Sequence, residues 1–187
     1  SDYGVVGADE IDEVVSNLNR HHINGIQFYD WHNKHHMPLP VSGSIPADKW
    51  KDIINRDNYL STIESYIDAV HSRGMKAMFY NLVYGAWDNA ETDGVKNEWY
   101  MYNDATHTNK DVFALPMPPF LSNLYLLDPS NSEWQQYLSE QNKKVYQFLD
   151  FDGYHMDQVG NRGNRYKYDG TFLDLSKTFQ SFIESDK

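Results

Sequence analysis

Three polar side chains stand at the ends of hydrophobic runs or close to them. Asp30 ends "GIQFYD", Asn81 follows "KAMFY", and Asp157 ends "FDGYHMD". The carboxyl ends of parallel strands meet at one rim of a sheet, where carboxylates can act on a substrate as nucleophiles or as general acids and bases. Alternatively, an aspartate such as Asp157 caps the next helix or braces a turn. Three such ends in one chain favour the functional interpretation.

A histidine-rich segment follows Asp30. In "DWHNKHHMP", His32, His35 and His36 are separated by the short intervals that on a helix are typical of metal ligands. The flanking prolines oppose a helix and no H-E-x-x-H motif is present, so we expect neither a metal nor a cofactor. The histidines of this segment, together with Trp31, are explained at least as well by hydrogen bonding to a hydroxyl-rich ligand as by metal binding.

The neighbours of Asp157 and of Asn81 add further candidates. His155 alternates with Asp157 along its strand, so both side chains point to the same side. His155 therefore either lines the same site or is a histidine of the core. Tyr80 and Tyr84 lie along the run that contains Asn81, and rings at a rim can stack on pyranose sugars, although some of the aromatic residues must simply cover the core.

Apolar periodicity predicts the elements that must position these side chains. Strands are expected at residues 3–6, 26–29 and 76–85 and within 151–160, and helices at residues 8–20, 58–73 and 130–149 and from 175 onwards. Asp57 is expected to cap the second helix, and Ser132 with Gln135 to form a capping box at the third. Two long segments, residues 31–56 and 87–119, follow strands, whereas helices connect to the next strand by short turns.

This alternation predicts an α/β fold with parallel strands in a single domain, residues 1–187. Two architectures agree with it: a doubly wound open sheet, or about the first four β/α units of an eight-stranded TIM-type (β/α)8 barrel, a half barrel. The long segments after strands favour the barrel, because barrel enzymes build active sites from those loops. No G-x-G-x-x-G or G-x-x-x-x-G-K-[ST] motif is present to hold a nucleotide.

The composition narrows the choice of partners. A net charge of -11 opposes binding to nucleic acid, and no apolar run approaches the length of about 18 residues needed to span a membrane. The chain has no cysteine, which excludes disulfides and thiolate chemistry. Aromatic residues make up 15% of the chain, and flat rings with polar edges suit sugar faces as well as cores.

Four stretches resemble, in order, the catalytic barrel of glycoside hydrolase family 66: "HINGIQFYDWHNKHHMPLP", "KAMFYNLVYGA", "LDPSNSEWQQYL" and "FDGYHMDQVG". That family comprises endo-dextranases and cycloisomaltooligosaccharide glucanotransferases. The resemblance implies a retaining attack on the α-1,6-glucosidic bonds of dextran or isomaltooligosaccharides, with Asp157 as nucleophile and Asp30 holding the substrate or tuning the nucleophile. The other side chains expected at the substrate are Trp31, His35, His36, Tyr80, Asn81, Tyr84, His155 and Gln158.

A retaining enzyme also needs an acid/base carboxyl group, which the resemblance places on a glutamate beyond Lys187. We therefore expect little or no dextran hydrolysis by this chain alone. Half of a barrel leaves two strand edges open, and pairing of these edges in a homodimer is one way to cover them. Because dextran is an extracellular polymer, an extracellular or periplasmic location is expected, although the chain shows no signal peptide.

Several alternatives stay open at this point. Hydrolysis and cyclising transfer share one covalent intermediate, and hydrolysis is favoured because no acceptor-holding feature is evident in the sequence. A non-catalytic α-glucan-binding fragment would bind glucan through its aromatic loops without producing new reducing ends. A metal-dependent hydrolase that uses the histidine segment would be inhibited by chelators.

Overall fold

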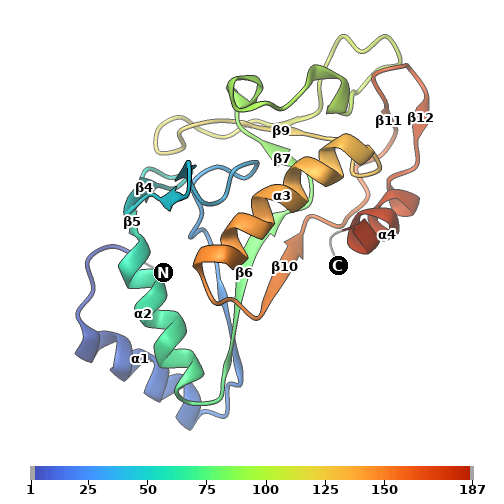
Figure 1. The fold of residues 1–187 in the computed structure, drawn as a ribbon. Coiled ribbons are helices and arrows are strands. Elements are labelled where there is room, and N and C mark those ends of the chain that lie inside the picture. The colour runs from blue at the N-terminus through green and yellow to red at the C-terminus, as the bar shows by residue number, and fades with distance from the viewer. Residues whose placement is uncertain (1–2, 186–187) are drawn as a thin grey trace.

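A three-stranded parallel sheet forms the centre of the molecule (Figure 1). The computed structural model describes residues 3–185. In spatial order the strands of this sheet are β1 (Gly25–Phe28), β6 (Lys76–Leu82) and β10 (Gly153–Asp157). The helices that precede them in the chain are α1 (Ala8–Arg20), α2 (Leu60–His71) and α3 (Ser132–Phe148). Parallel strands joined through helices confirm the predicted α/β fold.

One face of this sheet is covered by the helices. Ile11 of α1, Ile63 of α2 and Val145 of α3 share a buried cluster with Phe28 and Phe79 of the sheet. Side chains alternate between the two faces of a strand, and on β6 the buried Phe79 is preceded by Met78, which is 39% exposed. The opposite face is therefore open at Met78, whereas Tyr80 and Leu82 further along the same face are buried.

The predicted strand at residues 3–6 is wrong. These described residues form no strand. The carbonyl oxygen of Tyr3 accepts a hydrogen bond from the amide of Tyr59 at 2.9 Å, and that of Gly4 accepts one from the hydroxyl of Thr62 at 2.7 Å. The ring of Tyr3 stacks on Phe28, with 5.8 Å between the centroids. The segment thus covers the start of α2, and the main sheet in the described part has three strands and does not close into a barrel.

The long segments after β1 and β6 are ordered by short strands. After β1 come β2 (Val41–Ser42), β3 (Ile45–Pro46), β4 (Lys49–Lys51) and β5 (Asp57–Tyr59). After β6 come β7 (Gly85–Ala86), the 3-10 helices η1 (Ala90–Asp93) and η2 (Asn97–Trp99), β8 (Val112–Phe113) and β9 (Leu124–Leu126). The strands β7, β9 and β8 form an antiparallel sheet that lies beyond the carboxyl end of β6 (Figure 1).

Two predicted helix caps are wrong by a few residues. Asp57 does not cap α2, because it lies in β5 and pairs with Lys49 at 3.0 Å and with Lys51 at 2.8 Å. The cap of α3 is Asn131 instead of Ser132: its side-chain oxygen accepts hydrogen bonds from the amides of Glu133 and Trp134 at 3.0 and 3.1 Å. Asparagine and serine serve equally well as caps, so sequence alone does not choose between neighbours.

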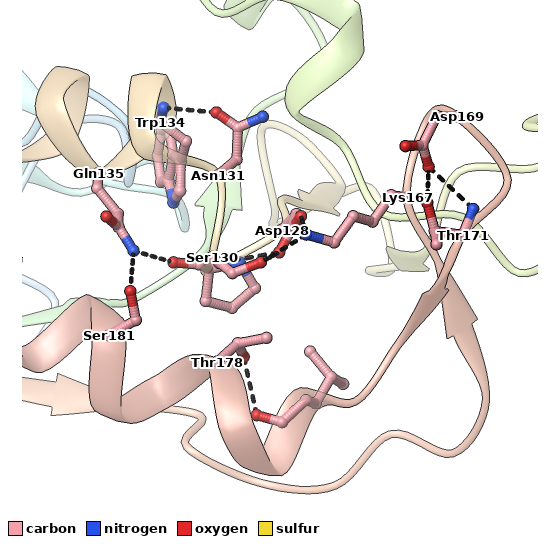
Figure 2. Close-up of polar contacts among 12 residues, drawn as sticks. Asp128, Ser130, Asn131, Trp134, Gln135, Lys167, Asp169, Thr171, Thr178 and Ser181 are labelled. Atoms are coloured by element: carbon pink, nitrogen blue, oxygen red, sulfur yellow. Dashed lines mark hydrogen bonds and ion pairs between the residues drawn. The ribbon is translucent and has the colours of Figure 1, made fainter.

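The segment after β10 is tied to the start of α3 (Figure 2). It contains β11 (Arg165–Tyr166), β12 (Phe172–Leu173) and α4 (Leu175–Ser185). The ammonium group of Lys167 lies 3.5 Å from the carboxylate of Asp128, and Gln135 donates a hydrogen bond to the hydroxyl of Ser181 at 3.2 Å. None of the helices within residues 3–185 has both the length and the apolar character that crossing a membrane requires.

Candidate active site

Asp157 is the last residue of β10, at the carboxyl end of the parallel sheet. The hydroxyl group of Tyr80, on the neighbouring strand β6, donates a hydrogen bond to its Oδ2 at 2.8 Å. The other carboxylate oxygen, Oδ1, has no hydrogen-bond partner among residues 3–185. Burial, together with this hydrogen bond, raises the pKa of Tyr80, so its hydroxyl stays a donor. The hydrogen bond from Tyr80 therefore orients the carboxylate through Oδ2 and leaves Oδ1 available to contact a substrate.

Asp30 lies at the same rim, two residues after the end of β1. Its φ of 50° places it in the left-handed region, which is uncommon for a residue other than glycine and turns the chain sharply after the strand. Burial raises the pKa of the Asp30 carboxyl group, and the charge of Arg56, whose Nη2 lies 3.8 Å from Oδ2, opposes the rise. Two carboxyl groups thus stand at the carboxyl ends of β1 and β10, the two strands that flank β6.

A pocket of about 410 Å³ opens beside these groups. Four of the residues predicted at the substrate line it: Asp30, His35, Tyr80 and Gln158. The rest of its wall is mostly apolar and is formed by Tyr29, Ile53, Ile54, Leu82, Phe113, Leu115, Phe120 and Leu124. Asp157 is not part of the wall itself. The wall does include Tyr80, which donates a hydrogen bond to Asp157, and Gln158, which follows it in the chain.

Asn81 and Tyr84 lie behind the pocket and hold its backbone. Both side chains are fully buried. Asn81 donates to the carbonyl oxygen of His35 at 2.8 Å, and the hydroxyl group of Tyr84 donates to the carbonyl oxygen of Gln158. Gln158 adopts a φ of 66°, another left-handed conformation directly after Asp157. The structure therefore places these two residues as supports of His35 and Gln158, away from the pocket wall.

Trp31 and His36 also lie in the interior. The indole of Trp31 is fully buried and donates to the carbonyl oxygen of Tyr80 at 3.2 Å. The ring of His36 is fully buried, and its Nε2 lies 2.9 Å from Oδ2 of Asp93. The structure brings neither side chain to the pocket wall. Their positions link the segment after β1 to β6 and to η1.

Burial keeps the three histidine rings of this segment uncharged. His32 is buried, and burial lowers its pKa to about 3. Burial also lowers the pKa of His36 to about 4 and that of His35 well below its usual range. Within the described part of the chain, no group of three or more histidine, aspartate or glutamate side chains is placed to hold a metal ion.

His155 and Tyr29 flank Tyr80. The ring of His155 lies 5.9 Å from that of Tyr80, and its Nδ1 is buried without a hydrogen-bond partner among the described residues. The ring of Tyr29 lies 4.3 Å from that of Tyr80 and is 49% exposed. Tyr29 was not predicted at the site, although its place directly before Asp30 was a usable signal. Apart from Leu82 of β6, the apolar wall residues come from the connections between β1 and α2 and between β6 and α3, and their spacing carried no such signal.

The chain is similar to known glycoside hydrolases and glucanotransferases. The model of glycosyl hydrolase family 66 matches residues 1–187. A cycloisomaltooligosaccharide glucanotransferase of Niallia circulans is 39% identical over 165 residues, which are 88% of this chain and 17% of that protein. A dextranase of Streptococcus salivarius is 25% identical over 206 residues, 99% of this chain and 25% of that protein.

A solved structure of similar fold extends the comparison. The crystal structure of a Paenibacillus sp. cycloisomaltooligosaccharide glucanotransferase, complexed with cycloisomaltoheptaose, superposes with a TM-score of 0.93 at 33% identity and covers 99% of this chain. The chain corresponds to 26% of that structure, so it spans about a quarter or less of the relatives that it matches. Since the family model matches from the first residue to the last, the chain belongs to glycosyl hydrolase family 66.

Proposed function

We propose that this chain carries the nucleophile of an enzyme that cleaves α-1,6-glucosidic bonds of dextran or isomaltooligosaccharides with retention of configuration. The observation that supports it most is the carboxylate of Asp157, held through Oδ2 by Tyr80 at a strand end while Oδ1 is unpartnered among the described residues. Retaining glycosidases use such a carboxylate for covalent attack. Membership of family 66 supports the same chemistry.

In the proposed first step, Oδ1 of Asp157 attacks the anomeric carbon of a glucose unit. The bond from that carbon to the glycosidic oxygen breaks, and the leaving oxygen takes a proton from a second carboxylic acid, which stands about 5 to 5.5 Å from the nucleophile in retaining enzymes. The hydroxyl of an acceptor then attacks the anomeric carbon and returns the proton to that acid. We place this acid on a glutamate elsewhere in the enzyme and give Asp30 the task of holding sugar hydroxyls.

The nucleophile can be tested without the second acid. A 5-fluoro-α-glucosyl fluoride has a leaving group that departs with little protonation, so it should label Asp157 covalently in this chain alone. Mass spectrometry of the intact chain and of its peptides would report one added sugar on the peptide that contains Asp157. Asp157→Asn should abolish labelling, whereas Asp12→Asn, which alters an exposed carboxylate of α1 paired with Arg73, should leave it unchanged. Label on another residue would refute the assignment.

A second candidate within the same chemistry is cyclising transfer. In that case the acceptor is a hydroxyl group of the glucan chain itself, and water is excluded from the intermediate. The identity of 39% to a glucanotransferase, against 25% to a dextranase, favours transfer over the hydrolysis expected from the sequence. With isomaltosyl fluoride as donor, transfer predicts longer or cyclic isomaltooligosaccharides, and hydrolysis predicts free isomaltose. A chain that binds glucan, forms neither product and takes up no covalent label at Asp157 acts as an α-glucan-binding fragment.

We further propose that residues 1–187 are a single structural unit, about half of a (β/α)8 barrel. The parallel order of β1, β6 and β10 supports this view. Helices cover one face of the sheet and Met78 is exposed on the other; parallel sheets are usually covered on both faces, so this exposed position fits a sheet that is part of a barrel.

β1 and β10 each pair only with β6 among the described residues, so both sheet edges are open to a second copy. Analytical ultracentrifugation would detect the homodimer. An extracellular or periplasmic location follows from the proposed substrate.

A further inference from the structure

Trp87 contacts two consecutive histidines through two different N–H groups. It follows β7 and is buried. Its backbone amide donates to Nδ1 of His36 at 3.2 Å, and its indole Nε1–H donates to Nδ1 of His35 at 3.3 Å. One residue thus contacts the same ring nitrogen in both imidazoles.

These contacts determine which nitrogen of each ring carries the proton. An amide N–H and an indole N–H can only donate, so each Nδ1 must be the acceptor, and a neutral imidazole then carries its proton on Nε2. For His36 a second contact agrees, because its Nε2 faces Oδ2 of Asp93 at 2.9 Å and a carboxylate oxygen accepts. The tautomer of His36 is therefore set at both ring nitrogens.

His35 differs from His36 at the second nitrogen. No residue in the described part of the chain accepts a hydrogen bond from Nε2 of His35. His35 lines the pocket beside Asp30 and Tyr80, and burial keeps its ring uncharged. Because this N–H group is accessible from the pocket and has no acceptor among the described residues, it can donate to an acceptor atom of a bound ligand. A sugar hydroxyl oxygen is such an acceptor.

We propose that Trp87 is a positioning residue whose indole holds His35 as an Nε2–H donor for a hydroxyl oxygen of a bound glucose unit. This inference rests on the proposed function, because it takes a glucan as the ligand of the pocket. Trp87 itself acts only through His35. His36, held by the backbone of the same tryptophan and by Asp93, anchors the segment.

The variant Trp87→Phe separates the two histidines. It removes the indole N–H but keeps an aromatic ring and the backbone amide, so His36 serves as an internal control. Long-range ¹H–¹⁵N NMR of the imidazoles should show Nε2–H for both histidines in the wild-type chain. In the variant His36 should be unchanged, and His35 should shift towards a mixture of tautomers. Binding of isomaltotriose, measured by calorimetry, should weaken about threefold to tenfold, the effect of one hydrogen bond.

Three results would overturn the proposal, and they are distinguishable. An Nδ1–H signal for His35 in the wild-type spectrum, which requires no variant to fold, overturns the role of Trp87 alone. Equal affinity of the wild type and Trp87→Phe for isomaltotriose, with the tautomers as expected, overturns the donor role of His35. A wild-type chain that binds no isomaltotriose overturns the glucan ligand together with the proposed function, while the tautomers still report on Trp87.

Discussion

The hydroxyl group of Tyr80 reaches diagonally across two parallel strands to Oδ2 of Asp157, with 2.8 Å between the two oxygens. In the register of the sheet Tyr80 lies opposite His155, whereas Asp157 lies opposite Leu82. The tyrosine therefore leans along the strand direction towards the carboxyl end. This hydrogen bond restrains rotation of the Asp157 carboxylate, so the orientation of the carboxylate depends on Tyr80.

Tyr80→Phe should slow covalent labelling of Asp157 by the glucosyl fluoride about tenfold to a hundredfold. The substitution removes one hydrogen bond to a charged group, worth about 1.5 to 3 kcal/mol, and keeps the ring that packs against Tyr29. Labelling rates from mass spectrometry provide the measurement. The matched control is Tyr102→Phe, which removes a hydroxyl that donates to the carbonyl oxygen of Asn97 and should leave the rate unchanged. Equal rates for Tyr80→Phe and the wild type would exclude a positioning role of Tyr80.

Asp30→Asn should make the protein more stable at neutral pH. Burial raises the pKa of Asp30 in the folded state, so the folded state binds the proton more tightly than the unfolded state does. Stability is therefore lost as the pH rises from the ordinary pKa of 3.8 through the higher folded-state value. An amide removes this cost. We expect a gain of about 0.5 to 1 kcal/mol in the free energy of unfolding at pH 7, measured in urea, and none at pH 3. Lower stability of Asp30→Asn at pH 7 would show that the charge is favourable where it stands.

The strand ends that carry Asp30 and Asp157 could be predicted from the sequence, because apolar runs and the order of parallel strands bring such ends to one rim. Burial of individual aromatic residues could not. Trp31 and Tyr29 flank Asp30, yet Trp31 is fully buried and Tyr29 is 49% exposed. The difference arises because the indole of Trp31 finds an acceptor on Tyr80, 49 residues away, and periodicity carries no information about that partner.

The helix boundaries and the pocket wall show the same limit. Asp57 has the composition of a cap, but pairing with Lys49 and Lys51 draws it into β5. The apolar wall of the pocket includes Phe113 and Phe120, from a segment with no regular spacing. Local signals therefore predicted the main elements, whereas contacts between distant segments decide which side chains face the pocket.

The free energy of unfolding should fall steeply as the pH drops below 6.5. Burial lowers the folded-state pKa of His32 to about 3 and of His36 to about 4, and it lowers that of His35 well below 6.5. Between those values and 6.5 the unfolded chain binds protons that the folded chain excludes, so each histidine contributes a loss of up to about 1.4 kcal/mol per pH unit. Urea unfolding at pH 7.5, 6.5 and 5.5 provides the measurement.

The source of this pH dependence can be checked with paired variants. His32→Phe removes a titrating ring whose two nitrogens have no hydrogen-bond partner among the described residues, and it should reduce the slope below pH 6.5 by about a third. His21→Gln alters an exposed histidine and should leave the slope unchanged. An unchanged slope in His32→Phe would mean that other groups cause the loss of stability.

Asp111→Asn should release the segment that follows Asp157. Asp111 is 4% exposed, and its carboxylate accepts hydrogen bonds from Nε of Arg162 at 2.7 Å and from Nε of Arg165 at 2.8 Å. The guanidinium group of Arg162 also covers the ring of Phe113, a wall residue of the pocket, at 4.0 Å. Removing the carboxylate leaves two partly buried cations without their shared anion, which costs about 3 to 5 kcal/mol for a buried pair.

Hydrogen exchange of residues 158–166 tests this prediction directly. The amides in this range should exchange faster in Asp111→Asn, and labelling of Asp157 should slow because the backbone after it is no longer held. The matched variant Lys110→Gln removes the neighbouring charge, which pairs with Glu91, and should change neither readout. Arg165→Gln keeps the Arg162 pair, so an intermediate effect is expected, since the pocket contact of Arg162 survives. If Asp111→Asn lowers overall stability while exchange in residues 158–166 rises no more than elsewhere, the carboxylate stabilises the fold as a whole and does not position the segment.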